Sequence, residues 1–146
     1  MSENSEVPSD MREFNRQLVV KFRETGGVGE FGPVDFSRLV LLTTTGRRSG
    51  EPRTVPLGAA RDAGDDLLLF ASNQGAPQHP DWFLNLRDDP HVTVEITGLT
   101  WEADAVVLAG DERDDAYRRW IEAAPHVADH EQKAGRTIPM VRIPTR

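Results

Sequence analysis

The first regular stretch of the chain has hydrophobic residues three or four positions apart. Met11, Phe14, Leu18 and Phe22 follow this spacing, which places them on one face of a helix. The glycines that follow this stretch are typical of a helix end. The pattern predicts an amphipathic helix over residues 10–24, and residues 1–9 are expected to be a polar, disordered lead.

Short apolar and β-branched runs separated by turn residues fill the middle of the chain. Buried strands are predicted over residues 39–44, 53–60 and 67–71. Strict alternation predicts two half-buried strands over residues 92–96 and 101–107, and a last strand is expected over 138–143. Apolar faces predict helices over residues 80–86 and 111–124, and the stretch 127–133 is compatible with a short helix.

The order of these elements favours an antiparallel architecture. The strands follow one another mainly through hairpins and do not alternate regularly with helices, which argues against a doubly wound parallel sheet. The sequence therefore predicts an α+β, mainly β fold: a small, partly closed barrel of about six antiparallel strands with peripheral helices. The length of 146 residues suits one domain over residues 10–146.

Composition excludes several classes of protein. The net charge of -7 argues against a nucleic-acid-binding protein. The chain has no cysteine, which excludes disulfides, cysteine-bound metals and thiol nucleophiles. Neither a secretory signal nor an integral membrane segment is recognisable, so a cytoplasmic location is expected.

Positive charge is concentrated in one segment of this acidic chain. Residues 43–61 contain four arginines against one glutamate, a local balance of +3, and the arginines flank Gly46 and Gly50. Glycines let backbone amides converge on an anion, and arginine binds phosphate oxygens with paired donors. The spacing fits neither a P-loop nor a Rossmann motif. An anion site and a solvated hairpin tip stay equally open from these residues alone.

A second segment, residues 70–82, leaves a strand through small residues and enters a helix. Small residues let a planar ligand lie against the backbone, and exposed amides could meet its ring. The alternative is an ordinary connection that ends in a buried Trp82.

Metal and hydrolase chemistry find little support. His126 and His130 are spaced to share a helix face, but no third ligand accompanies them. No serine lies in the Gly-x-Ser-x-Gly context of a hydrolase. No metal is therefore expected.

Several linked motifs resemble one family at matching spacing. They are LLTTTGRRSGEPR at 41–53, Pro-Leu at 56–57, the Ala-Ser and Gly-Ala pairs at 71–72 and 75–76, PDWFLNL at 80–86 followed by Asp-Pro at 89–90, and RTIP at 136–139. Together they resemble the deazaflavin-dependent nitroreductase family of actinobacteria, from about residue 39 to residue 143.

The resemblance implies a split β-barrel like that of FMN-binding proteins, and the cofactor coenzyme F-420, an 8-hydroxy-5-deazaflavin with an anionic phospholactyl polyglutamate tail. It implies that Arg47, Arg48, Ser49 and Arg53 hold the phosphate and tail. It further implies that the ring system is met by Thr54, Val55, Pro56, Leu57 and Gly58 from beneath, by Phe70, Ala71, Ser72 and Asn73 at its edge, and by Trp82, Phe83 and Asn85 at its side.

Two departures from the family pattern concern the substrate. Members that reduce nitroimidazoles and quinones have a tyrosine-rich patch before the last strand, whereas residues 124–130 here contain no tyrosine. A lysine of the loop near Ser72 is replaced by Asn73. Val127 and His130 are expected to line the substrate side. His130 is a candidate proton donor because its ordinary pKa is near neutrality, and the alternative is a surface histidine.

The resulting hypothesis is an F-420-dependent reductase that passes hydride to a small electron-poor molecule: an activated alkene such as an enone or unsaturated lactone, a quinone or a nitroaromatic. No certain catalytic side chain is expected, because the cofactor carries the chemistry. The alternatives are an FMN-binding or haem-linked split-barrel protein and a non-catalytic cofactor or lipid carrier. The oligomeric state stays open, with a homodimer as one possibility because split barrels often pair through their sheets.

Overall fold

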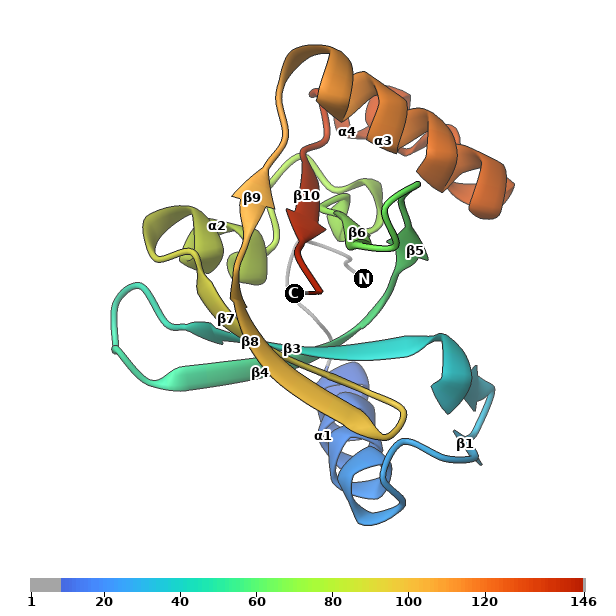
Figure 1. The fold of residues 1–146 in the computed structure, drawn as a ribbon, viewed down its shortest axis with the longest axis vertical. Helices are drawn as coiled ribbons and strands as arrows, with labels where there is room; N and C mark the ends of the chain where they lie inside the picture. Colours follow the sequence, from blue (N-terminus) through green and yellow to red (C-terminus); the bar gives the residue numbers. More distant parts are fainter. Residues whose placement is uncertain (1–8, 146) are drawn as a thin grey trace.

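The centre of the protein consists of two four-stranded antiparallel sheets (Figure 1). The structure is a computed structural model that describes residues 9–145. The expected disordered lead, residues 1–9, lies outside the described residues except for Ser9. Ser9 is the first residue of helix α1, which spans Ser9–Glu24. The predictions of antiparallel sheets and peripheral helices are confirmed.

The first sheet has the strand order β4-β3-β7-β8, with bounds Pro52–Gly58, Leu39–Thr45, His91–Ile96 and Leu99–Asp104. Strand β3 is buried on both faces. Val40 and Leu42 point to the main core between the sheets, and Leu41 packs against Leu18 and Phe22 of α1 on the opposite face. This two-sided burial explains the continuous apolar run in the sequence.

The second sheet has the order β5-β6-β10-β9, with bounds Ala60–Arg61, Leu67–Phe70, Met140–Ile143 and Val106–Val107. Leu69 and Val141 face the main core. Leu68 and Met140 face outward and pack against Ala116 of helix α3, which spans Gly110–Ala123. Helix α3 therefore covers the outer face of this sheet.

Two backbone segments pass from one sheet to the other. Only Ala59 separates β4 from β5, and only Ala105 separates β8 from β9. The sequence analysis predicted each segment as one strand, and it missed the small hairpin of β1, Glu30–Phe31, with β2, Val34–Asp35. The expected six strands are thus ten in the described part, arranged as separate sheets and not as a closed barrel.

Shorter helices occupy the connections. Helix α2 spans Asp81–Asp88 and helix α4 spans His130–Ala134. Single 3-10 turns, η1 to η3, lie at Phe36–Arg38, Asn73–Gly75 and Pro125–Val127. Within residues 9–145, no helix is both long and apolar enough to cross a membrane.

Candidate functional site

The hairpin that joins β3 to β4 has a tip of defined shape. Thr45 and Pro52 form its last strand pair, and beyond them Gly46 N donates to Glu51 O at 2.8 Å. A Cβ on Gly46 would lie 2.7 Å from the Ser49 hydroxyl oxygen, and Gly50 has a φ of +73°. The positive φ of Gly50 therefore favours glycine, and a Cβ at position 46 would force the Ser49 hydroxyl and the Glu51 carbonyl to shift.

Helix α2 holds this tip from the side through Asn85, which is only 4% exposed. Asn85 Nδ2 donates to Thr44 Oγ1 at 3.1 Å. Asn85 Oδ1 accepts from Arg47 N at 3.2 Å and from Arg47 Nη1 at 2.8 Å. Arg47 Nη2 also lies 3.1 Å from Asp81 Oδ1. The charge of Arg47 is thus engaged within the protein.

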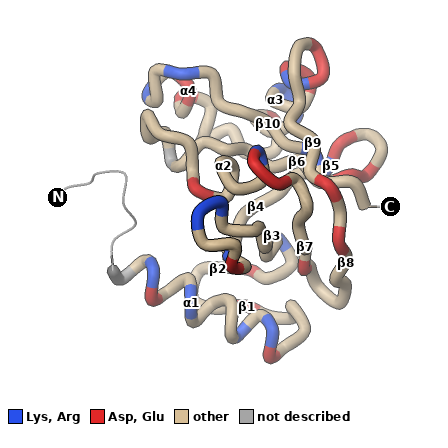
Figure 2. The backbone as a smooth tube through the Cα atoms, turned by 90° about the vertical axis from the view of Figure 1, so that its left-hand side faces the viewer, with Lys and Arg blue, Asp and Glu red and all other residues tan. Residues whose placement is uncertain are grey.

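Two other arginines of the tip remain available to a ligand. Arg48 and Arg53 are exposed, and the described residues offer neither of them a carboxylate within ion-pairing distance. Arg53 Nη2 makes only a long contact of 3.4 Å with the Ser49 hydroxyl oxygen. Figure 2 shows the basic tip beside helix α2. The tip therefore presents two uncompensated cations in an acidic protein.

A pocket of about 610 Å³ lies against this tip. It brings together half of the residues predicted for the cofactor: Arg47, Arg48, Ser49, Arg53, Thr54, Val55, Trp82 and Asn85. The sequence analysis did not assign four further lining residues, Thr44, Gly46, Pro52 and Asp81. Thr44, Gly46 and Pro52 belong to the motif at 41–53 and Asp81 to the motif at 80–86, but the sequence analysis gave them no role.

Farther along β4, successive side chains point to different faces of the sheet. Val55 and Leu57 pack against the main core. Thr54 Oγ1 lies 2.7 Å from Thr43 Oγ1 and 3.4 Å from Arg23 Nη2 of α1, and Pro56 is paired with Leu41. Gly58 is exposed. Residues 54–58 therefore do not form one continuous surface of side chains.

The loop after β6 meets helix α4. Ser72, 8% exposed, has its hydroxyl oxygen 3.2 Å from His130 Nδ1. The His130 ring is nearly parallel to the Phe70 ring, with centroids 6.3 Å apart and an angle of 12°. Burial lowers the pKa of His130 below its ordinary value, with further lowering from Lys133 that the charge of Asp129 opposes. His130 is therefore a half-buried partner of Ser72.

The remaining predicted residues occupy separate positions. Ala71 is fully buried, and Asn73 adopts a φ of +53° with its Nδ2 donating to Gln78 O at 3.2 Å. Phe83 is buried in the main core. Val127 is half-buried at the end of η3. The described residues also contain no group of three or more side chains that could hold a metal ion.

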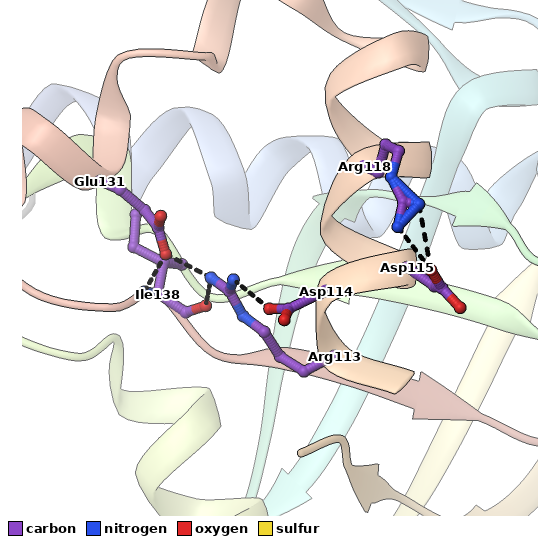
Figure 3. A network of polar contacts seen from close by, with 6 residues as sticks. All are labelled: Arg113, Asp114, Asp115, Arg118, Glu131 and Ile138. Carbon is purple, nitrogen blue, oxygen red and sulfur yellow. Dashed lines mark hydrogen bonds and ion pairs between the residues drawn. The ribbon is translucent and has the colours of Figure 1, made fainter. Parts of the chain in front are cut away.

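A polar network attaches α4 to α3 and to the segment just before the last strand (Figure 3). Arg113 of α3 is paired with Glu131, and its Nη2 donates to Ile138 O at 2.7 Å. Glu131 Oε2 in turn accepts from Ile138 N at 2.8 Å. Glu131, the residue next to His130, is therefore held by Arg113 of α3 and by the backbone of Ile138, just before β10.

Comparison with known proteins identifies the family. Residues 14–144 match the family model of the F420H(2)-dependent quinone reductases. An F420H(2)-dependent quinone reductase of Mycobacterium tuberculosis is 32% identical, over 73% of this chain and 73% of its own length.

Two solved structures are similar in both fold and sequence. An F420-H2 dependent reductase (FDR-A) is 33% identical with a TM-score of 0.66, over 73% of this chain and 94% of that one. A protein described as a domain-swapped dimer is 29% identical with a TM-score of 0.69, over 88% of this chain and 98% of that one. The match over residues 14–144, together with these relatives, places the chain in the F420H(2)-dependent quinone reductase family, an oxidoreductase family whose cofactor is coenzyme F-420.

Proposed function

We propose that this protein passes a hydride from reduced F-420 to a small electron-poor molecule, and that quinones are its first substrate class. The observation that carries the proposal is the pair of exposed arginines, Arg48 and Arg53, that have no acidic partner in the described residues and border a pocket of about 610 Å³. An anionic cofactor supplies the missing negative charge. The name of the matching family supports quinone as the acceptor.

The donor set fits the tail of F-420. Guanidinium groups bind phosphate and carboxylate oxygens through paired donors, and the Ser49 hydroxyl, 3.4 Å from Arg53 Nη2, adds a further donor. Arg47, which is engaged by helix α2, is expected to shape the tip and to bind the tail less directly. The other proposed contacts remain Thr54, Val55, Pro56, Leu57, Gly58, Phe70, Ala71, Ser72, Asn73, Trp82, Phe83 and Asn85.

The protein's own contribution to the reaction is orientation and proton supply. Bound F-420 supplies hydride from its deazaflavin ring, and the enzyme has to align the acceptor and exclude water. We assign the proton to the Ser72 and His130 pair, in which the Ser72 hydroxyl lies 3.2 Å from His130 Nδ1. Because burial lowers the pKa of His130 and favours its neutral ring, the donors of this pair are the ring N–H and the Ser72 hydroxyl. Val127 is assigned to the wall of the same substrate side. FMN is the weaker candidate because the family cofactor is a deazaflavin.

Titration of the purified protein with F-420, followed by fluorescence, tests the cofactor site. Arg53→Ala should weaken binding by roughly tenfold or more, because it removes charge-assisted hydrogen bonds. Arg118→Ala is the matched control, since that arginine lies on α3 and is paired with Asp115. A flat titration of the wild-type protein would refute the proposal.

The acceptor class is tested by following oxidation of reduced F-420 with quinones, enones, unsaturated lactones and nitroaromatics. Turnover with a quinone that exceeds turnover with the other classes supports the proposal. Tight binding without turnover on any acceptor would favour a non-catalytic carrier.

We further propose a split barrel in one domain over residues 10–146, a cytoplasmic location and a homodimer. The dimer is suggested by the similar protein described as a domain-swapped dimer. Light scattering coupled to size-exclusion chromatography tests it, and a monomer mass at high concentration would contradict it.

A further inference from the structure

The guanidinium of Arg136 lies within the loop that connects β6 to α2. Its Nε donates to Ala76 O at 3.2 Å. Its Nη2 lies 3.0 Å from Gln78 O, 3.1 Å from Ser72 O and 3.3 Å from Ala71 O. One side chain therefore binds four carbonyl oxygens that are spread along the whole loop.

A fifth contact joins Arg136 to His79, which lies in the loop two residues before helix α2 begins. Arg136 Nη1 lies 3.0 Å from His79 Nδ1, and because a guanidinium only donates, that ring nitrogen must accept. Burial lowers the pKa of His79, and the charges of Arg136 and Arg87 lower it further, which favours the neutral ring. The ring centroids of His79 and Phe83 are 4.9 Å apart. The contact thus reaches the buried face of α2.

The loop has few hydrogen bonds of its own. Gly75 N donates to Ser72 O and Ala76 N donates to Asn73 O, each at 3.0 Å. In the described part of the chain, no carboxylate forms an ion pair with Arg136. The role of this arginine is therefore to brace a backbone segment and not to balance an acidic side chain.

Ser72 is the point where this brace reaches the proposed reaction site. Arg136 binds the Ser72 carbonyl oxygen, and His130 Nδ1 lies 3.2 Å from the Ser72 hydroxyl oxygen. The stem of Lys133 covers the same loop, because a Cβ on Gly75 would lie 2.9 Å from Lys133 Cδ. Residues 130–136 therefore hold the loop at several points.

We propose that Arg136 is a positioning residue for hydride transfer: it braces the backbone of residues 71–78 so that Ser72 and His130 stay in contact on the substrate side. This inference rests on the proposed function, in which Ser72 and His130 face the acceptor. Arg136 itself acts through Ser72 and does not touch the reacting atoms.

Hydrogen exchange of the cofactor-free protein tests the brace. Arg136→Met keeps the stem but removes every donor, so amide exchange within residues 71–79 should rise roughly tenfold or more. Exchange in α1 and β3 should stay unchanged. Arg118→Met, on the exposed side of α3, should leave the loop unaffected. Unchanged exchange in Arg136→Met would overturn the inference.

Kinetics test the connection to Ser72 and His130. Arg136→Met should lower kcat with a quinone by roughly tenfold to a hundredfold, since small misplacements of a reacting group have effects of that size. Affinity for F-420 should change little, because its tail is bound by the hairpin tip. The kcat of Arg136→Lys should lie between those of the wild type and Arg136→Met, because lysine keeps the charge but not the planar set of donors.

A double-mutant cycle separates positioning from general stability. In a His130→Gln background, Arg136→Met should lower kcat by much less than in the wild-type background, because the contact that it protects is already lost. Fully additive losses would overturn the positioning role. If wild-type protein does not bind F-420, the proposed function fails together with the role in hydride transfer, whereas faster exchange would still establish the brace.

Discussion

Replacing Asn85 with alanine should destabilise the protein, because this side chain joins helix α2 to the hairpin tip. The Asn85 side chain satisfies three polar atoms: Thr44 Oγ1, Arg47 N and Arg47 Nη1. Thr44 is 2% exposed and Asn85 is 4% exposed, so water cannot readily take the place of the amide. The substitution therefore leaves buried polar groups without partners.

The expected magnitude follows from these contacts. A buried polar group that loses its partner costs about 1–3 kcal/mol. The Thr44 hydroxyl and the Arg47 amide are both affected, while the Arg47 guanidinium can turn toward solvent or Asp81. Asn85→Ala should thus lower the free energy of unfolding by about 2–4 kcal/mol. Binding of F-420 should weaken as well, because the hairpin tip loses its attachment to α2.

Urea denaturation measures the change, as a shift of the midpoint at unchanged slope. Thr44→Val is the matched comparison, because it removes only the hydroxyl that Asn85 binds, and it should cost roughly half as much. The two losses should be less than additive in the double variant, since the residues are partners. A loss below about 0.5 kcal/mol for Asn85→Ala, within the range of surface substitutions, would refute this account of the site.

Three other changes test separate parts of the structure. Gly46→Ala should destabilise the hairpin tip and weaken F-420 binding in the same fluorescence titration, because its Cβ would lie 2.7 Å from the Ser49 hydroxyl oxygen and 3.2 Å from Glu51 O. Gly64→Ala, outside the site and with its nearest atom at an ordinary 3.5 Å, should be close to neutral in that titration. The hydrogen bonds of His91 to two carboxylates, Glu102 and Asp104, raise its pKa. The stability that His91 contributes is therefore complete below its ordinary pKa and is lost as the pH rises through the raised value. Melting curves recorded over this pH range should show the loss in the wild-type protein and not in His91→Gln. Glu131→Gln should lower kcat more than cofactor affinity by loosening the pair with Arg113, and equal losses would contradict that role.

Much of the fold was predictable, because the local spacing of hydrophobic residues indicates which segments form helices and strands. The spacing of Leu18 and Phe22 predicted the helix that is observed as α1, Ser9–Glu24. The bends at Ala59 and Ala105 were not predictable, since alternation continues through a strand that changes sheets. The β1–β2 hairpin was missed because strands of two residues show no periodicity.

The candidate site was predictable in location and less so in detail. Local excess of arginine and two glycines indicated the hairpin tip, and the pocket lies there. The sequence could not distinguish Arg47 from Arg48, since the difference arises from Asn85, 38 residues away in the chain. The contacts of Arg136 with its loop likewise join residues 57–65 positions apart. Such partners are set by tertiary packing, which composition and spacing do not encode.

Aromatic side chains lie near Ser72 although the tyrosine-rich patch of other family members is missing. Residues 124–130 contain no tyrosine, and the single tyrosine of the chain, Tyr117, stands on α3. Its ring lies 5.8 Å from the Phe70 ring, as does the ring of Trp120, and Phe70 in turn stacks on His130. Aromatic side chains are therefore present one layer behind the loop, where they support Phe70 and His130 from α3. If His130 lines the acceptor side as proposed, changes to Tyr117 or Trp120 on α3 should alter the choice of acceptor in the acceptor screen, because these rings support Phe70, which stacks on His130.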